Sequence, residues 1–328
     1  MIHFETDAVK CQALWEQFTP HQRAWDEWDL MYAFHDQATY LFNFMVHETD
    51  GQIDGLIPLV KDTSDGSYEL FGGCYPDSRI LWIDIAHFPE YYDNLPDNTV
   101  FFDLKGSFVA SILSQYPEYE SNFVEQDLQY FLIPAEFDYD FVNHINTFST
   151  DKRKGFLRDL RKIRELNPDL ELVWSDTDES ELFISLSLKN FGADSDHVTE
   201  GGKQEVRRVV SELQELGFLK TLTITIAGVK QATSLSALYN NAWVSLYAGS
   251  NNDYKNLGKL LNVETIQEGC RLKVDEVNYM TGMTWKSAWH MKENPCRTMR
   301  KPAKKIEPAV EPSSETTTEP NSEPTGTK

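Results

Sequence analysis

The chain has 328 residues, of which 41% are hydrophobic and 12% aromatic. This composition excludes a wholly disordered chain, and the length exceeds what one hydrophobic core usually serves, so two domains of about 150 residues are expected. The longest apolar stretches, such as 41–46 and 56–60, are far shorter than the roughly 20 residues of a membrane-spanning helix. No membrane span is therefore predicted.

The formal net charge of −22 is concentrated in the first half. Residues 1–150 contain 5 Lys and Arg against 26 Asp and Glu, whereas residues 151–300 contain 21 of each. An acidic first half repels phosphate backbones, so DNA binding is not expected. The four cysteines and eight histidines have no metal-type spacing, and the first ten residues lack a secretory leader. We expect a cytoplasmic protein with reduced thiols and no metal.

The first half opens with two helical patterns, at 9–18 and 25–34. Three β-rich segments follow, and Asp-Gly pairs separate them, which predicts a three-stranded meander because Asp-Gly supplies the positive φ of tight hairpins. The meander segments are 40–47, 53–60 and 68–71. The remaining elements are expected to be strands at 80–85 and 99–104, a helix at 108–115 and two short strands within 122–133. Together they predict an acidic domain at 1–148.

The second half opens with a basic helix. Seven cations lie within residues 152–164, and only one acidic residue interrupts them. On a helix, one face of this segment is apolar and another carries a basic stripe that includes Arg158 and Arg161. Two interpretations stay open: the stripe pairs with the acidic first half, or Arg158 and Arg161 bind an anionic group of a substrate.

The order of elements then repeats that of the first half, which predicts a second domain at 149–300. The expected strands are 170–174, 220–227, 231–239, 242–248 and 273–278, and the expected helices are 179–191, 203–216 and 257–269. From residue 301 the chain contains no aromatic residue, and Pro recurs beside regularly spaced Glu. Such a segment cannot bury enough apolar surface to offset its ordering entropy, so 301–328 is predicted to be a disordered tail.

Common catalytic signatures are missing: there is no GxSxG elbow, GxxxxGK[ST] loop or GxGxxG turn. The informative segment is a strand (WVSLYAGS, 243–250), a polar loop (NNDYKN, 251–256) and a helix (LGKLLNVETIQEG, 257–269). The N-terminus of a helix carries unpaired N–H groups and a partial positive charge, so it favours a phosphate.

This order, followed by a strand with Asp, a glycine, and WK and W, resembles the C-terminal part of tandem GNAT-type acyltransferases. That group includes FemAB-like enzymes and acetyltransferases linked to cellulose biosynthesis. Upstream, DKRKGFLRDLRKI (151–163) is similar to the basic opening of the family's second domain. LGFLKTLTITIAGVKQA (216–232) is similar to its strand pair, and DGQIDGLIPLV (50–60) to a first-domain meander strand. The resemblance implies an α+β fold of two tandem GNAT-like domains, each a mixed, mostly antiparallel sheet flanked by helices.

The resemblance also implies a donor site in the second domain, built from two groups of residues. One group lies on the strand whose backbone meets the acyl donor, and the other forms the loop and helix start that face its phosphates. In that order the groups are Tyr247, Ala248 and Gly249, and Asn256, Leu257, Gly258 and Lys259. The donor implied is acetyl-CoA or another acyl-CoA, although a loop with one glycine departs from ordinary GNAT proteins.

Catalytic roles are implied for Lys286, which stands in a Lys-x-x-Trp segment and would stabilise the reacting centre, and for Tyr247. Asp275 and Glu276 are adjacent in a strand and point to opposite faces, so at most one of them faces the site. That residue, with Asp275 as the candidate, or Tyr279 would take the proton of the amine.

The resulting hypothesis is a cytoplasmic N-acyltransferase that acts on a small-molecule or peptidoglycan-precursor-like amine. The alternatives are a FemAB-like transferase that takes its acyl group from aminoacyl-tRNA, and a non-catalytic binding protein with a GNAT fold.

Overall fold

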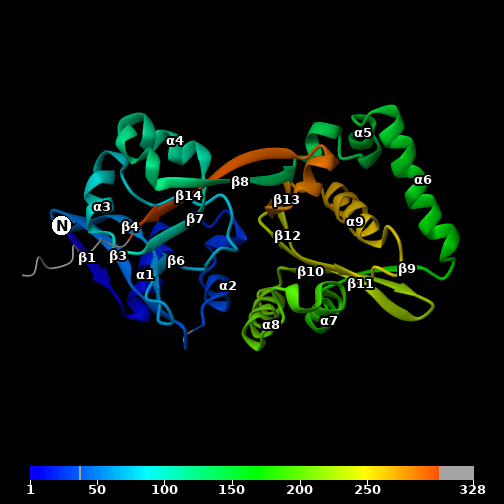
Figure 1. Cartoon of the computed structure of the whole chain (residues 1–328), viewed down its shortest axis with the longest axis horizontal. Coiled ribbons are helices and arrows are strands. Elements are labelled where there is room, and N and C mark those ends of the chain that lie inside the picture. Colours follow the sequence, from blue (N-terminus) through cyan, green and yellow to red (C-terminus); the bar gives the residue numbers. More distant parts are fainter. Residues whose placement is uncertain (37, 303–328) are drawn as a thin grey trace, which may run out of the picture.

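The computed structural model describes residues 1–36 and 38–302, which form an α+β molecule of two helix-flanked halves (Figure 1). The predicted α+β class is confirmed. Of the predicted tail, Lys301 ends the last strand, and residues 303–328 lie outside the described residues.

The first half packs short helices against short strands. Its helices are α1 (Ala8–Phe18), α2 (Trp28–Ala33), α3 (Phe88–Asn94) and α4 (Gly106–Gln115), with 3-10 turns η1 (Ala24–Asp26), η2 (Ile85–His87), η3 (Pro117–Asn122) and η4 (Pro134–Phe137). Its strands are β1 (Ile2–Glu5), β2 (Tyr40–Phe42), β3 (Phe44–Thr49), β4 (Gln52–Ile57), β5 (Leu59–Asp62), β6 (Tyr68–Leu70), β7 (Thr99–Lys105) and β8 (Phe123–Leu132).

The expected meander is present only in part. Asp50 and Gly51 adopt φ of 52° and 77° and connect β3 to β4, as the Asp-Gly pair predicts. The expected strand 53–60, however, breaks at Pro58, which has no N–H to donate, so β4 joins β3 and β1 in one sheet while β5 joins β2 and β6 in another. The expected strand at 80–85 is wrong, because this segment forms a single isolated bridge, between Trp82 and Leu56.

The second half has longer elements. Its helices are α5 (Phe141–Asn146), α6 (Thr150–Leu166), α7 (Ser180–Phe191), α8 (Glu200–Glu215) and α9 (Leu257–Leu272), with 3-10 turns η5 (Gly192–Asp194) and η6 (Thr284–Trp289). Its strands are β9 (Glu171–Ser175), β10 (Leu219–Ile226), β11 (Val229–Tyr239), β12 (Ala242–Ser250), β13 (Glu276–Thr281) and β14 (Lys292–Lys301).

One continuous sheet links the halves. Within the described residues it has 11 strands in the order β2-β5-β6-β7-β14-β8-β13-β12-β11-β10-β9. The last strand, β14, lies between β7 and β8, so residues 292–301 complete the sheet of the first half (Figure 1). Gly106 permits this insertion, because a Cβ at Gly106 would lie 2.6 Å from the carbonyl oxygen of Pro295.

A shared apolar core joins the halves. Trp25, Trp28 and Phe34 of the first half belong to the same buried cluster as Val206 and Tyr247 of the second. Helix α2 packs against α8 (Figure 1). The contact between the halves therefore rests mainly on apolar and aromatic burial.

Candidate functional site

Strands β12 and β13 separate inside the second half. They pair in parallel over three positions only, Ala242–Val244 with Glu276–Asn278. Strand β12 continues to Ser250 against β11, with a register irregularity at Leu235/Ser236. No described strand pairs with residues 245–250 on the β13 side. The carbonyl oxygen of Ser250 accepts from the side-chain amide of Asn190 at 2.7 Å, so the backbone groups that can meet a ligand there are those of 245–249.

The three predicted donor residues on β12 face different surroundings. Ala248 is exposed, and Gly249 packs against α7, where an added Cβ would lie 3.2 Å from Cβ of Leu186. Tyr247 is buried, with its ring centroid 6.0 Å from that of Tyr75 and 5.2 Å from that of Phe183. Burial, and next the nearby Tyr75, raise the pKa of Tyr247 well above its usual value, so its hydroxyl keeps its proton at neutral pH.

The start of α9 follows β12 after the polar loop. Asn256 adopts φ of 68°, and no side chain caps the helix. Leu257 is buried, and Gly258 lies beside Ser250, whose Oγ would be 3.2 Å from an added Cβ. Lys259 is engaged elsewhere: its Nζ lies 2.5 Å from Oδ2 of Asp159 and so ties α9 to α6. The predicted phosphate-facing segment can therefore offer a phosphate its backbone N–H groups, whereas the ammonium of Lys259 is already paired with Asp159.

Arg158 and Arg161 lie on the exposed side of α6, at the end of the molecule farthest from the first half (Figure 1). Their partners are on the same helix, with Asp159 3.8 Å from Arg158 and Glu165 3.5 Å from Arg161. The expected pairing of this stripe with the acidic first half is wrong, since α6 packs on α9. The inward face of α6 carries Phe156, whose ring meets that of Trp289 in η6 edge to face with centroids 5.1 Å apart, whereas the two arginines lie on the exposed side.

Lys286 lies at the junction of the halves and is only 6% exposed. Its ammonium donates to the carbonyl oxygens of Thr281 at 2.6 Å and Met280 at 3.3 Å. Burial lowers the pKa of Lys286 to about 8, although the charges of Asp77 and Asp127 favour its protonated form. Lys286 is therefore a cation held in a poorly solvated place, with neutral oxygens as its direct partners.

The two predicted proton acceptors do not face this lysine. Asp275 is exposed, and Tyr279 donates its hydroxyl to the carbonyl oxygen of Asn262 at 3.2 Å within an apolar core. Burial raises the pKa of Tyr279, so it is not a base at neutral pH. The alternation argument selects Glu276 instead, which is half-buried and has a pKa raised first by burial, while Arg23 opposes the shift.

The junction also contains polar residues that the sequence patterns did not reveal. Asp77 is 2% exposed, and the amide of Asn278 donates to both of its oxygens at 3.3 and 3.2 Å. Asn294 of β14 donates to Oε1 of Gln129 at 3.0 Å, and the Gln129 side chain in turn reaches Asp77. Burial raises the pKa of Asp77 and makes it a stronger base than an exposed carboxylate.

A second buried carboxyl group lies nearby. The hydroxyl of Thr281 donates to Oδ2 of Asp103 at 2.9 Å, and burial raises the pKa of Asp103 to about 6. We call Asp77, Asp103, Gln129, Asn278, Asn294 and Lys286 the junction cluster. Its members come from five places in the chain: the loop after β6, then β7, β8, the β13–η6 segment and β14. No short motif links these places, which explains why only Lys286 was found from sequence.

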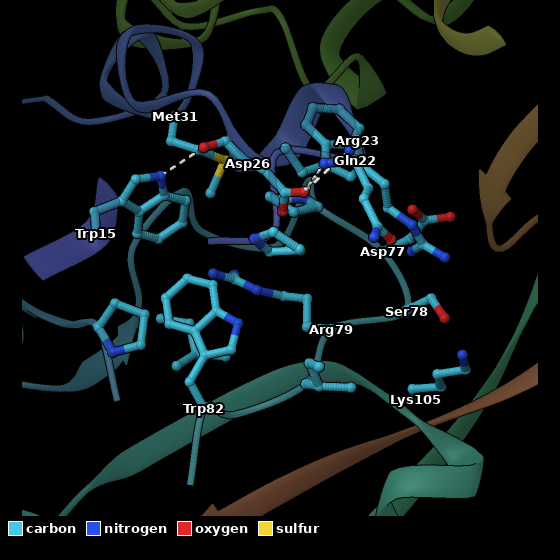
Figure 2. A pocket seen from close by; sticks show the side chains of 16 residues that line it. Trp15, Gln22, Arg23, Asp26, Met31, Asp77, Ser78, Arg79, Trp82 and Lys105 are labelled. Atoms are coloured by element: carbon cyan, nitrogen blue, oxygen red, sulfur yellow. Dashed lines mark hydrogen bonds between the residues drawn. The ribbon is translucent and has the colours of Figure 1, made fainter. Parts of the chain in front are cut away.

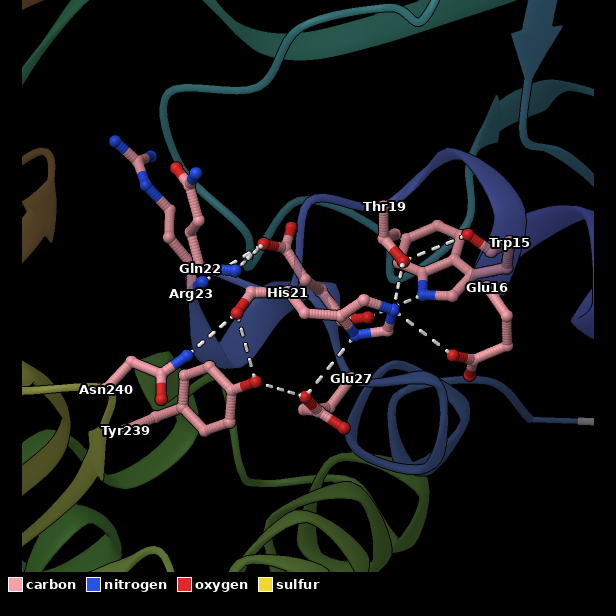
Figure 3. Close-up of polar contacts among 10 residues, drawn as sticks. Trp15, Glu16, Thr19, His21, Gln22, Arg23, Glu27, Tyr239 and Asn240 are labelled. Carbon is pink, nitrogen blue, oxygen red and sulfur yellow. Dashed lines mark hydrogen bonds and ion pairs between the residues drawn. The ribbon is translucent and has the colours of Figure 1, made fainter.

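A pocket of about 240 Å³ adjoins the cluster in the first half (Figure 2). Asp77 forms part of its wall, as do the indoles of Trp15, Trp25 and Trp82 and the cations Arg23, Arg79 and Lys105. The loop that carries Arg23 is fixed to the second half, because Asn240 donates to the carbonyl oxygen of His21 at 2.7 Å (Figure 3). The pocket therefore opens where the two halves meet.

Among the described residues, no group of three His, Cys, Asp or Glu side chains is placed to hold a metal ion. None of the helices in the described ranges is both long enough and apolar enough to cross a membrane.

No family model matches the chain, and no curated protein matches it by sequence. Solved structures do match its fold. A conserved protein of unknown function from Bacteroides thetaiotaomicron is 12% identical with a TM-score of 0.55, and the match covers 90% of this chain and 99% of that chain. FemX is 8% identical with a TM-score of 0.55, covering 90% and 96%. A tandem GNAT protein from the clavulanic acid biosynthesis pathway is 10% identical with a TM-score of 0.52, covering 91% and 97%. At these identities the likeness shows the fold, which is two tandem GNAT-like domains.

Proposed function

We propose that this tandem GNAT-fold chain is an N-acyltransferase that moves an acyl group from a thioester, with acetyl-CoA or another acyl-CoA as the donor, to an amine at the junction. The observation that carries the proposal is the junction cluster, in which the buried ammonium of Lys286 and the buried carboxyl of Asp77 lie close enough to influence each other's charge. Buried groups with shifted pKa values beside a pocket are characteristic of catalytic sites.

The donor part of the proposal rests on β12 and α9. Where β12 leaves β13, the free backbone edge at 245–249 can accept and donate hydrogen bonds along an extended acyl chain. The uncapped first turn of α9 follows directly and favours the phosphates of the same donor.

The chemical step assigns one role to each buried group. The amine nitrogen attacks the thioester carbonyl, the C–N bond forms, and the proton of the amine passes to the carboxylate of Asp77. The C–S bond then breaks, and the thiolate leaves and takes up a proton. Negative charge develops on the carbonyl oxygen during the attack, and the ammonium of Lys286 stabilises it, which is typically worth about 3 to 4 kcal/mol for one well-placed donor.

A second candidate donor is an aminoacyl ester carried on tRNA. One observation favours it: Arg158 and Arg161 present an exposed basic stripe on α6, and α6 is tied to the first turns of α9 through Asp159 and Lys259. An exposed row of cations next to a donor site suits a polyanion. Transfer from aminoacyl-tRNA would fall steeply with salt, whereas transfer from a small thioester would not.

The test is a screen of the purified chain with acetyl-CoA and longer acyl-CoA donors against amino acids, amino sugars and peptides. Release of the thiol and the mass of the acylated product are both measured. We expect activity in the wild type and in Lys292→Met, whose Lys292 makes a surface ion pair with Glu136. Lys286→Met is expected to be at least a hundredfold slower.

If neither acyl-CoA nor aminoacyl-tRNA supports any transfer, the chain is a non-catalytic binding protein and the proposal is wrong. Transfer from aminoacyl-tRNA alone would replace the proposed donor.

A further inference from the structure

The cations of the first half are gathered in one place. Residues 1–150 contain only five Lys and Arg, and three of them, Arg23, Arg79 and Lys105, line the pocket beside the junction cluster (Figure 2). Within the described ranges, none of the three forms an ion pair with a carboxylate. In a half with such an excess of acid, three cations around one cavity form a local site for an anion.

Arg79 is the most constrained of the three. Its guanidinium donates to the carbonyl oxygens of Phe71 at 2.5 Å and Gly73 at 2.8 Å, which fix its position but are neutral. Burial lowers the pKa of Arg79 to about 10, so it stays charged at neutral pH. A guanidinium has five N–H donors, and the two carbonyls leave others for a ligand. The charges of Glu69 and Asp103 favour the protonated form of Arg79, but within the described residues neither carboxylate forms an ion pair with it. A bound anion would therefore be the direct counter-ion of this poorly solvated charge.

The carboxylates of the pocket do not fill this role. Asp26 accepts from the backbone N–H groups of Gln22 at 2.8 Å and Arg23 at 3.0 Å, and so holds its own loop. Asp77 accepts from the amide of Asn278 on both of its oxygens and so is engaged with β13.

Most of the remaining wall is apolar. The rings of Trp15 and Trp82 meet edge to face, with centroids 5.0 Å apart, and Met31 lies beside them. The indole N–H of Trp15 donates to the carbonyl oxygen of Asp26 at 2.7 Å, so this ring presents carbon to the cavity. The volume of about 240 Å³ is below the range of roughly 300 to 1,000 Å³ that drug-sized ligands occupy, so it suits one small molecule.

We propose that this pocket binds the amine acceptor as a small amino carboxylate, with its carboxylate on Arg79 and its apolar side chain against the rings of Trp15 and Trp82. The role of this ligand as acyl acceptor rests on the proposed function, whereas its binding to the pocket does not. Since Asp77 borders both the pocket and the junction cluster, an amine on the same molecule can reach the proton acceptor.

The test measures binding without any acyl donor, by tryptophan fluorescence and calorimetry. Three probes share a phenyl ring and differ in their polar group. 3-Phenylpropionate carries a carboxylate, phenethylamine carries an amine and no carboxylate, and phenyl phosphate carries a phosphate in place of the carboxylate. We expect 3-phenylpropionate to bind at least tenfold more tightly than phenethylamine. Arg79→Met should weaken the binding of 3-phenylpropionate at least tenfold, because a hydrogen bond to a charged group is lost.

Lys61→Met is the matched control, since Lys61 is a first-half cation that lies outside the pocket, over the ring of Tyr68. It should leave binding unchanged. If Arg79→Met fails to fold, Lys105→Met leaves the carbonyl contacts of Arg79 intact and should weaken binding several-fold. Equal binding of phenethylamine, tighter binding of phenyl phosphate, or unchanged binding in both pocket variants would overturn the inference. A chain that binds 3-phenylpropionate but transfers no acyl group would contradict the proposed function alone.

Discussion

The charge of Lys286 predicts a specific dependence of the acyl transfer rate on pH. Its pKa is lowered to about 8 by burial, so the ammonium begins to lose its proton at mildly alkaline pH, where an exposed lysine is still charged. Only the protonated form stabilises a developing oxyanion. We therefore expect kcat of the wild type to fall as pH rises through about 8, and to approach a tenfold loss per pH unit above it.

Substitution isolates this effect. Lys286→Met removes the charge and keeps most of the volume, so kcat should fall by roughly a hundredfold at pH 7, and the alkaline limb should vanish. Lys286→Arg stays charged across this range and should also lose the limb. Lys286→Arg should restore the rate poorly. A planar guanidinium cannot occupy the position of the ammonium and at the same time keep its hydrogen bond to the carbonyl oxygen of Thr281.

The assay follows thiol release under saturating substrates from pH 6.5 to 9.5, with Lys292→Met as the control for the loss of a nearby lysine. An alkaline limb that persists in Lys286→Met would assign the titration to another group. A Met variant that retains more than a tenth of the wild-type rate would remove Lys286 from the catalytic site.

Three further predictions concern stability. Gly106→Ala should lower the free energy of unfolding by about 1 to 3 kcal/mol, because its Cβ would lie 2.6 Å from the carbonyl oxygen of Pro295. Gly155→Ala is the control and should not lower it, since its Cβ would meet only a side-chain atom at 4.0 Å. Urea titration measures the free energy of unfolding of both variants. Asp103→Asn should stabilise the fold by about 1 to 2 kcal/mol at pH 8 and should have no effect near pH 3.5. The reason is that burial raises the pKa of Asp103 to about 6, so the folded state loses stability as pH rises from about 4 through 6. Equal effects of the substitution at both pH values would contradict this. Deletion of Glu307–Lys328 should leave the melting temperature and acyl transfer unchanged, since that segment contains no aromatic residue.

The features that follow from local sequence were predicted well. The Asp50-Gly51 hairpin, the amphipathic helix α6 and the segment from β12 to α9 are each specified by residues close together in the chain. The strict alternation of a strand also identified that only one of Asp275 and Glu276 could face inward, and Glu276 is the half-buried one.

Long-range pairing could not be predicted in the same way. Strand β14 joins β7 and β8, which are more than 150 residues away, and no periodicity marks that register. The junction cluster depends on this pairing, because Asn294 of β14 meets Gln129 of β8, and Gln129 and Asn278 both hold the carboxyl group of Asp77. A single short polar turn, PDSR at 76–79, gave no sign that its polar residues Asp77 and Ser78 would be buried.

The central claim is a division of labour, with the donor in the second half and the acceptor in the first. Hydrogen–deuterium exchange with acetyl-CoA and, separately, with 3-phenylpropionate tests it most directly. We predict that acetyl-CoA slows exchange in 245–250 and 256–260, and that 3-phenylpropionate slows exchange in 76–82 and in the loop 20–26. If acetyl-CoA slowed exchange in 76–82 and did not slow it in 245–260, the donor would not lie in the second half and the division of labour would be wrong.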